Sequence, residues 1–172
     1  MTKAAAQLKL VCPNLPQRAI SLWDAEYGCA SCVKQTANVA ADKLMRLRSN
    51  RVLYGVPKAY TGLGRPCVHG DKFKLNDPTT WKTPDQRMQV NHPKWGGLCL
   101  RLWSALHFQQ SAKHSMSVIQ VERIDVAKQK NPKPLWLVWV GEQNKSLCSI
   151  WHQFQLWTVR RLKQQNHILW HH

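Results

Sequence analysis

The sequence predicts an α+β chain with two parts, a partial α/β core and an antiparallel β-rich subdomain inserted into it. A short apolar run at residues 19–23, a helix-like segment at 29–37 and an alternating strand at 43–48 indicate the core. Short strands between residues 77 and 123, separated by Pro, Gly and Asn, indicate the inserted part. Residues 135–140 are apolar on both faces, so we expect this strand in the centre of a sheet.

These patterns divide the chain at two points. We assign residues 1–54 to the partial core, 55–134 to the β-rich insertion, and 135–172 to a returning strand, a helix and an atypical tail. The tail has neither a helix cap nor an apolar face of useful length.

The remaining elements follow from local signals. Residues 4–10 are expected to be helical up to Pro13, residues 38–42 to form a turn, and residues 149–162 to form a helix. The strands expected in the insertion are 86–90, 98–103, 106–108 and 117–123.

The charge is far from balanced. The 172 residues include 25 Lys and Arg against 9 Asp and Glu, a formal net charge of +16. Such a surplus attracts polyanions, of which nucleic acid is the commonest partner. A basic ribosomal or membrane-surface protein would carry charge of the same sign. The charge therefore limits the classes of partner that the protein can have, but it does not indicate an activity.

Cysteine usage and hydropathy indicate a cytoplasmic chain. No apolar run approaches the length of a membrane span, and the first residues lack the apolar core of a secretion signal. The six cysteines are therefore expected to stay reduced. Cys29 and Cys32 form a CxxC pair, and Cys67 and His69 offer two further donors. Zinc binding and CxxC redox chemistry are alternatives, but structural zinc sites usually use two tight pairs.

Asp24 is the candidate metal ligand. It follows the apolar run 19–23 directly and is followed by a turn that ends at Gly28. A carboxylate at the end of a stiff strand is a hard oxygen donor of the kind that binds Mg²⁺. The alternative is a surface aspartate that simply closes a strand.

Basic side chains are candidates for phosphate contacts. Arg46, Arg48 and Arg51 form a row, and a guanidinium pairs with phosphate oxygens through two parallel hydrogen bonds. Lys72 and Lys74 flank an aromatic residue further along. The alternative for the arginines is a solvated strand face. Nine tryptophans are explained mostly by core packing, since base stacking needs exposed rings.

Four segments together resemble bacterial insertion-sequence transposases of the DDE class, which have a ribonuclease-H-like catalytic core. The segments are 21–28 (SLWDAEYG), 41–54 (ADKLMRLRSNRVLY), 64–74 (GRPCVHGDKFK) and 133–140 (KPLWLVWV). The resemblance covers roughly residues 7–153. It implies that Asp24 is the second of three catalytic carboxylates, which bind Mg²⁺ for strand cleavage and transfer. It also implies that Arg46, Arg48, Arg51, Lys72 and Lys74 hold the DNA backbone.

The departures from this pattern predict lost catalysis. No acid precedes Asp24, and none follows Glu142, although the final acid of the family lies on a helix just after a segment like 149–153. A frameshift near residue 154 would explain why the match ends there. We therefore expect a nucleoid-associated transposase fragment that is truncated at both ends, binds DNA and is inactive. Its further partners would be an intact transposase or a second copy, with no membrane and no small-molecule substrate. The alternative is a stand-alone basic nucleic-acid-binding or regulatory protein.

Overall fold

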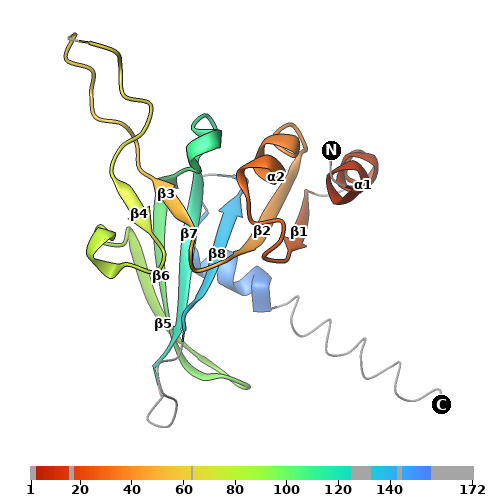
Figure 1. The fold of residues 1–172 in the computed structure, drawn as a ribbon. Helices are drawn as coiled ribbons and strands as arrows, with labels where there is room; N and C mark the ends of the chain where they lie inside the picture. The colour runs from red at the N-terminus through yellow and green to blue at the C-terminus, as the bar shows by residue number, and fades with distance from the viewer. Residues whose placement is uncertain (1–2, 16–17, 63, 125–132, 143–144, 156–172) are drawn as a thin grey trace, which may run out of the picture.

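A six-stranded β-sheet forms the centre of the protein (Figure 1). The computed structural model describes residues 3–15, 18–62, 64–124, 133–142 and 145–155, and excludes the side chain of residue 4. In spatial order the strands are β1 (Ala19–Trp23), β2 (Ala41–Leu47), β8 (Leu135–Val140), β7 (Met116–Arg123), β6 (Gly96–Leu106) and β5 (Gln86–His92).

Only the first two neighbouring strands of this sheet are parallel. Trp23 lies opposite Met45 in the β1–β2 ladder, whereas every other neighbouring pair is antiparallel. β8 lies between β2 and β7, which confirms the predicted central position of its apolar run. The predicted α+β class is confirmed as well.

Shorter elements flank the sheet. A two-stranded antiparallel ribbon of β3 (Val52–Tyr54) and β4 (Lys72–Lys74) carries the long loop that projects from the molecule in Figure 1. The other elements are α1 (Lys3–Val11), α2 (Ala30–Gln35), the 3-10 turns η1 (Cys12–Asn14), η2 (Pro78–Thr80) and η3 (Gln109–Ser111), and a helical segment at 147–155. None of the described helices is long and apolar enough to cross a membrane.

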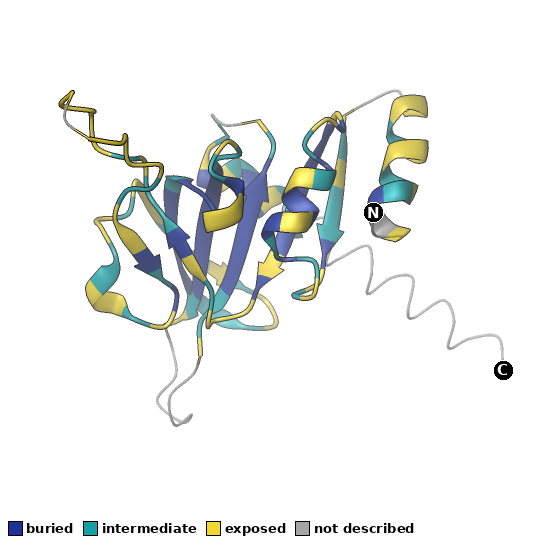
Figure 2. Ribbon diagram, turned by 45° about the horizontal axis from the view of Figure 1, so that its top comes forward, coloured by how far each residue is buried: buried dark blue, intermediate teal, exposed yellow. Residues whose placement is uncertain are grey.

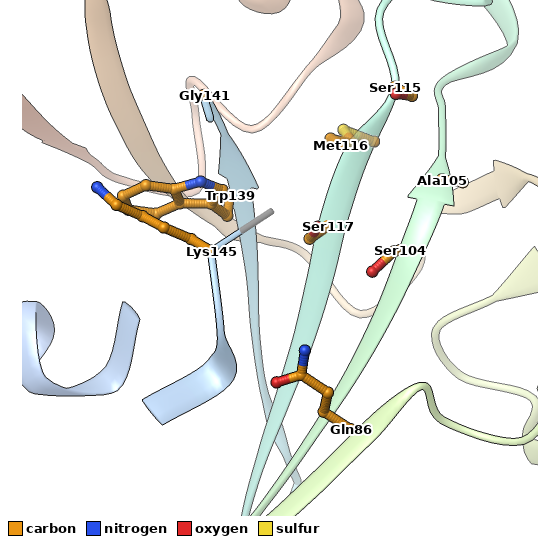
Figure 3. Close-up of a pocket in the computed structure, with 9 residues that line it drawn as sticks. All are labelled: Gln86, Ser104, Ala105, Ser115, Met116, Ser117, Trp139, Gly141 and Lys145. Carbon is orange, nitrogen blue, oxygen red and sulfur yellow. The ribbon is translucent and has the colours of Figure 1, made fainter. Parts of the chain in front are cut away.

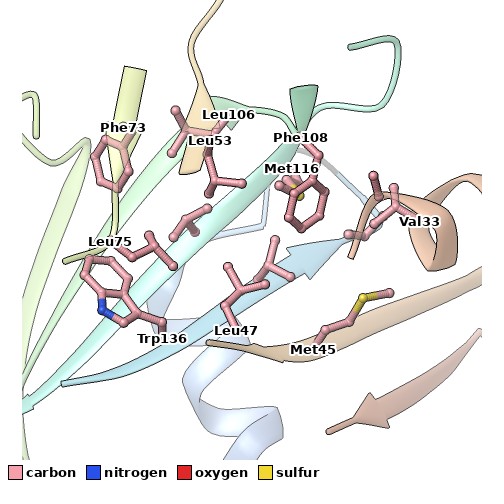
Figure 4. Packing of buried hydrophobic residues seen from close by; sticks show 14 of the residues in the cluster. Val33, Met45, Leu47, Leu53, Phe73, Leu75, Leu106, Phe108, Met116 and Trp136 are labelled. Carbon is pink, nitrogen blue, oxygen red and sulfur yellow. The ribbon is translucent and has the colours of Figure 1, made fainter. Parts of the chain in front are cut away.

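Each face of the sheet has its own hydrophobic core, because side chains on a strand alternate between faces. On one face, α2 and the β3–β4 ribbon cover the sheet, as Figure 4 shows, through Val33, Leu53, Phe73, Met45 and Trp136. On the opposite face, the helical segment 147–155 packs on the strands through Leu147, Ile150 and Trp151. In Figure 2 the middle strands are accordingly buried, while much of α1 is exposed.

A side-chain contact fixes where the last described helix begins. The backbone amide of Leu147 donates a hydrogen bond of 2.7 Å to Oε1 of Gln86 on β5. The helix expected at 149–162 therefore starts earlier, at residue 147, and residues 156–172 lie outside the described part of the chain. The atypical tail lies outside it too.

Two local predictions were wrong. Residues 38–42 are not all turn, because β2 begins at Ala41 and includes Asp42. The strand expected at 98–103 and the first residue of the one expected at 106–108 belong to one strand, β6, whose pairing with β7 is interrupted between Trp103 and Leu106; His107 instead bridges to Tyr54. Ala105, at this interruption, has a φ of 57°, a conformation that permits the local change in register.

The division at residues 54 and 134 stays a prediction. The strands assigned to the insertion, β5, β6 and β7, extend the same sheet as β1, β2 and β8. They therefore share both hydrophobic cores with the segment that contains Asp24.

Candidate functional site

Asp24 lies at the carboxyl end of β1, an outer strand of the sheet. Its side chain is exposed, and its Oδ1 accepts a 2.6 Å hydrogen bond from the backbone amide of Ala25. Its backbone carbonyl accepts a 3.0 Å bond from the amide of Tyr27, which closes the turn. The ring of the half-buried Tyr27 packs edge-on against Trp23, with 5.2 Å between centroids, so one aromatic contact joins the two sides of the turn at Asp24.

The turn that follows Asp24 rests on the end of β2. A Cβ atom at Gly28 would overlap the backbone carbonyl of Arg46, so only glycine allows this approach. In the parallel register Trp23 pairs with Met45, which places Arg46 level with Asp24 on the neighbouring strand. The structure thus brings together the predicted carboxylate and the first residue of the predicted arginine row.

The rest of the arginine row leads away from this end of the sheet. Arg46 and Arg48 are exposed, and the turn from Arg48 to Arg51 is closed by a 3.1 Å backbone hydrogen bond. The carbonyl of Arg51 accepts a 3.1 Å bond from the amide of Leu75, which anchors the turn to the end of β4. The Nε of Arg51 is buried, and among the described residues it has no hydrogen-bond partner.

The two lysines lie on the outer face of the β3–β4 ribbon. Lys74 pairs with Val52 and Lys72 with Tyr54, whereas Phe73 between them points into the core. Lys72 is exposed. Lys74 is half-buried, and its Nζ lies 3.4 Å from Oδ2 of Asp77, so its charge is partly offset. The ribbon joins the basic row through Arg51, but no described contact links either lysine to Asp24.

The tryptophans that the structure describes belong to the core. Trp103, Trp136 and Trp139 are almost fully buried, and Trp81 and Trp95 are half-buried. None of the seven described tryptophans is exposed, as base stacking would require.

The residues around Asp24 do not fit the two-magnesium centre that the resemblance implies. Among the described residues, no three His, Cys, Asp or Glu side chains lie close enough to hold a metal ion. One oxygen of Asp24 is already bonded to Ala25, and Glu26 is the only other described acid on the same turn. Two Mg²⁺ ions would lack most of their protein ligands here.

The other described acids lie elsewhere, and most of them are already engaged. Asp85 accepts a bond from the amide of Ser104, and Glu122 pairs with Arg101. Asp77 pairs with Lys74, and Asp42 pairs with Arg18 and Lys145. Asp71 lies on the loop before β4, Glu142 follows β8, and Asp125 lies outside the described residues.

Sequence reasoning missed a buried ionic cluster at the opposite end of β2. The carboxylate of Asp42 is 1% exposed and lies 2.8 Å from Nε of Arg18 and 2.8 Å from Nζ of Lys145. The amide of Glu142 donates a third bond of 3.2 Å. A Cβ atom at Gly141 would overlap this carboxylate, so glycine is needed there. The one local signal was the adjacent charged pair at 42 and 43, which the expected turn concealed.

Electrostatics in this region follow from burial. Burial alone would raise the pKa of Asp42, but hydrogen bonds from Lys145, Arg18 and the Glu142 amide outweigh it and lower the pKa.

Burial raises the pKa of the Cys32 thiol to about 11, with a further contribution from Cys29. A thiol with this pKa is protonated at neutral pH, and only the thiolate is a nucleophile. The raised pKa of Cys32 therefore argues against redox chemistry at the Cys29–Cys32 pair.

The chain matches a known family of proteins. The model described as DDE superfamily endonuclease matches residues 3–97, more than half of the chain. Asp24, Arg46, Arg48 and the basic residues of the ribbon all fall within this range. No curated protein matches the sequence.

Proposed function

We propose that this chain, which belongs to the DDE superfamily of endonucleases, binds DNA through the phosphate backbone and does not cleave it with its own residues. The observation that carries the proposal is the parallel pairing of β1 with β2, which puts the exposed Arg46 at the same end of the sheet as Asp24. Gly28, at the end of the turn after Asp24, packs on the backbone carbonyl of Arg46. The transposase activity implied by the resemblance, strand cleavage and transfer in insertion-sequence mobilisation, would require acids that the Asp24 turn does not supply.

The basic row supplies the binding surface in this proposal. Arg46 and Arg48 are exposed and make no ion pair within the described residues, so their charges are available to phosphate. Arg51, Lys72 and Lys74 continue the surface onto the β3–β4 ribbon. Contacts of this kind position a duplex without reading its sequence, and they release counterions, so affinity falls steeply as salt rises.

A salt titration tests the binding surface. We expect binding of a short duplex, followed by fluorescence anisotropy from about 50 to 200 mM salt, to weaken linearly on a double-logarithmic plot. Replacing both Arg46 and Arg48 by alanine is expected to reduce the slope by about 2, roughly one for each lost phosphate contact.

The matched control removes the same charge at the other edge of the sheet. Arg87 lies on β5 and Lys94 on the turn after it, and both are exposed. The Arg87→Ala, Lys94→Ala variant should bind with the slope of the unmodified chain. An equal loss in both variants would show that net charge, and not the surface beside Asp24, determines binding.

A nicking assay tests the absence of cleavage. With supercoiled plasmid and Mg²⁺, we expect the purified chain to give no nicking above the protein-free reaction, because a single carboxylate cannot hold the metal centre. Nicking by this chain that disappears in Asp24→Ala would contradict the proposal.

A further inference from the structure

A polar cavity of about 240 Å³ opens at the amino end of β2, away from Asp24. Its walls come from the α2–β2 connection, the turn before β7 and the end of β8. The polar side chains that line it are Arg18, Lys43, Lys113, His114 and Ser115. Figure 3 is a close-up of a neighbouring pocket and labels Ser115 and Gly141, two residues that also line this cavity, at the ends of β7 and β8.

Lys43 is the unusual member of this group. Its side chain is 3% exposed, and its Nζ donates a 3.2 Å hydrogen bond to the carbonyl of Val39. Within the described residues no carboxylate lies within ion-pair distance of this ammonium group. A buried charge that is bonded only to a neutral carbonyl is costly, and proteins normally pair it with an opposite charge.

The neighbouring charges increase this imbalance. Asp42 is the one carboxylate at this end of β2 with described ion pairs, and it is shared between Arg18 and Lys145. Burial, and then repulsion from Arg18, lower the pKa of Lys43 despite the opposing effect of Asp42. Lys113 adds an exposed cation at the mouth of the cavity.

Arg18 retains donors for a ligand. Its Nε is bonded to Asp42, and among the described residues its two terminal nitrogens make no hydrogen bond. A guanidinium and an ammonium group that line one cavity are the donors that bind phosphate oxygens.

We propose that this cavity binds a phosphate group, held by Lys43 and Arg18 and closed on its outer side by Lys113. The ligand is either a free phosphate ion or the terminal phosphate of a nucleic acid strand, since both present the same oxygens. The proposal goes beyond backbone binding at the basic row, because the two sites lie at opposite ends of β2.

Phosphate titration of the full chain tests this site. The melting temperature and calorimetric binding are measured against inorganic phosphate, with chloride adjusted to hold the ionic strength constant. We expect a saturable rise in melting temperature, as for any ligand that binds only the folded state. Lys43→Met should weaken phosphate binding at least about tenfold, because it removes a charge-assisted hydrogen bond but keeps most of the unbranched side chain.

Two further variants keep the test decisive. Lys113→Ala changes an exposed side chain and should also weaken binding, so it serves if Lys43→Met does not fold. Lys94→Ala removes an exposed lysine at the far edge of the sheet and should bind as the unmodified chain does. Equal phosphate responses in all these proteins, or an equal response to chloride alone, would overturn the proposal.

A second arm identifies the source of the phosphate. Short duplexes with and without a 5′-phosphate are compared in the Arg46→Ala, Arg48→Ala background, where binding through the basic row is weakened. A response to inorganic phosphate supports a free-ion site, and a preference for the phosphorylated duplex that Lys43→Met abolishes supports a strand end. No response to any phosphate overturns the site even if the unmodified chain binds DNA normally.

Discussion

The Nζ atom of Lys145 lies 2.8 Å from Oδ2 of Asp42, although the two residues are 103 positions apart in the chain. Arg18 binds the other oxygen of the same carboxylate. Asp42 therefore ties the segment before β1 and the segment after β8 to the amino end of β2. This cluster closes the end of the sheet opposite Asp24 and forms part of the surroundings of the proposed phosphate cavity.

Replacing Asp42 by asparagine should destabilise the fold. The amide keeps the shape of the side chain but removes the charge that two cations share, and we expect a loss of roughly 2–3 kcal/mol in the free energy of unfolding. The loss should stay at the low end of the range for a broken buried ion pair, because Arg18 is 47% exposed and can be rehydrated. Urea denaturation at neutral pH measures it, with Asp71→Asn, an exposed acid, as the control.

The stabilising effect of Asp42, measured with the same variant, should depend on pH. The pKa of Asp42 is lowered from its ordinary value of 3.8, so its stabilising effect is complete above that pH and disappears as the pH falls through the native pKa. The difference in unfolding free energy between the unmodified chain and Asp42→Asn should therefore be constant from about pH 5 to 7 and shrink below about pH 4. A difference that grows on acidification would contradict the assignment.

Replacing Gly28 by alanine should also destabilise the protein. The new methyl group would overlap the carbonyl of Arg46, so the turn after Asp24 would have to move away from β2. We expect a cost of about 1–3 kcal/mol, as for other overpacked sites. Thermal unfolding measures the effect, and Gly55→Ala is the control, since the nearest atom to a Cβ there is an ordinary 3.8 Å away. Equal melting temperatures for the two variants would contradict this contact.

Lys43→Met should stabilise the protein in phosphate-free buffer at pH 7, by on the order of 1 kcal/mol, because it removes a buried charge. The Val39 carbonyl keeps a partner, since it also accepts a 2.7 Å bond from the amide of Ala41. Because the pKa of Lys43 is lowered from 10.5, the native state loses its proton first, and the unmodified chain gains stability as the pH rises through that window.

The measurement for this variant is therefore the unfolding free energy at pH 7 and at about pH 10. The advantage of Lys43→Met should shrink at the higher pH, where the native lysine is closer to neutral. If Lys43→Met were less stable than the unmodified chain at pH 7, the Lys43 side chain would stabilise the fold, and its buried charge would not be destabilising.

Sequence reasoning could place those elements whose signals are local. The strand before Asp24 and the central position of β8 follow from short apolar runs with recognisable ends, since a run that is apolar on both faces fits only the middle of a sheet. The same reasoning placed the start of β2 too late, because its first turn-like residues enter the sheet through tertiary contacts.

The sequence by itself determined the charge surplus, the presence of an acid at the end of an apolar strand, and the scarcity of other acids that could join it. Only the tertiary structure decided that Arg46 lies at the same end of the sheet as Asp24, that Asp42 is bound by two distant cations, and that Lys43 lines a cavity with no carboxylate partner among the described residues. The physical reason is the distance along the chain over which each kind of interaction acts. Periodicity and turn chemistry act over a few residues, whereas charges are paired or left unpaired by strands that meet only when the sheet has formed.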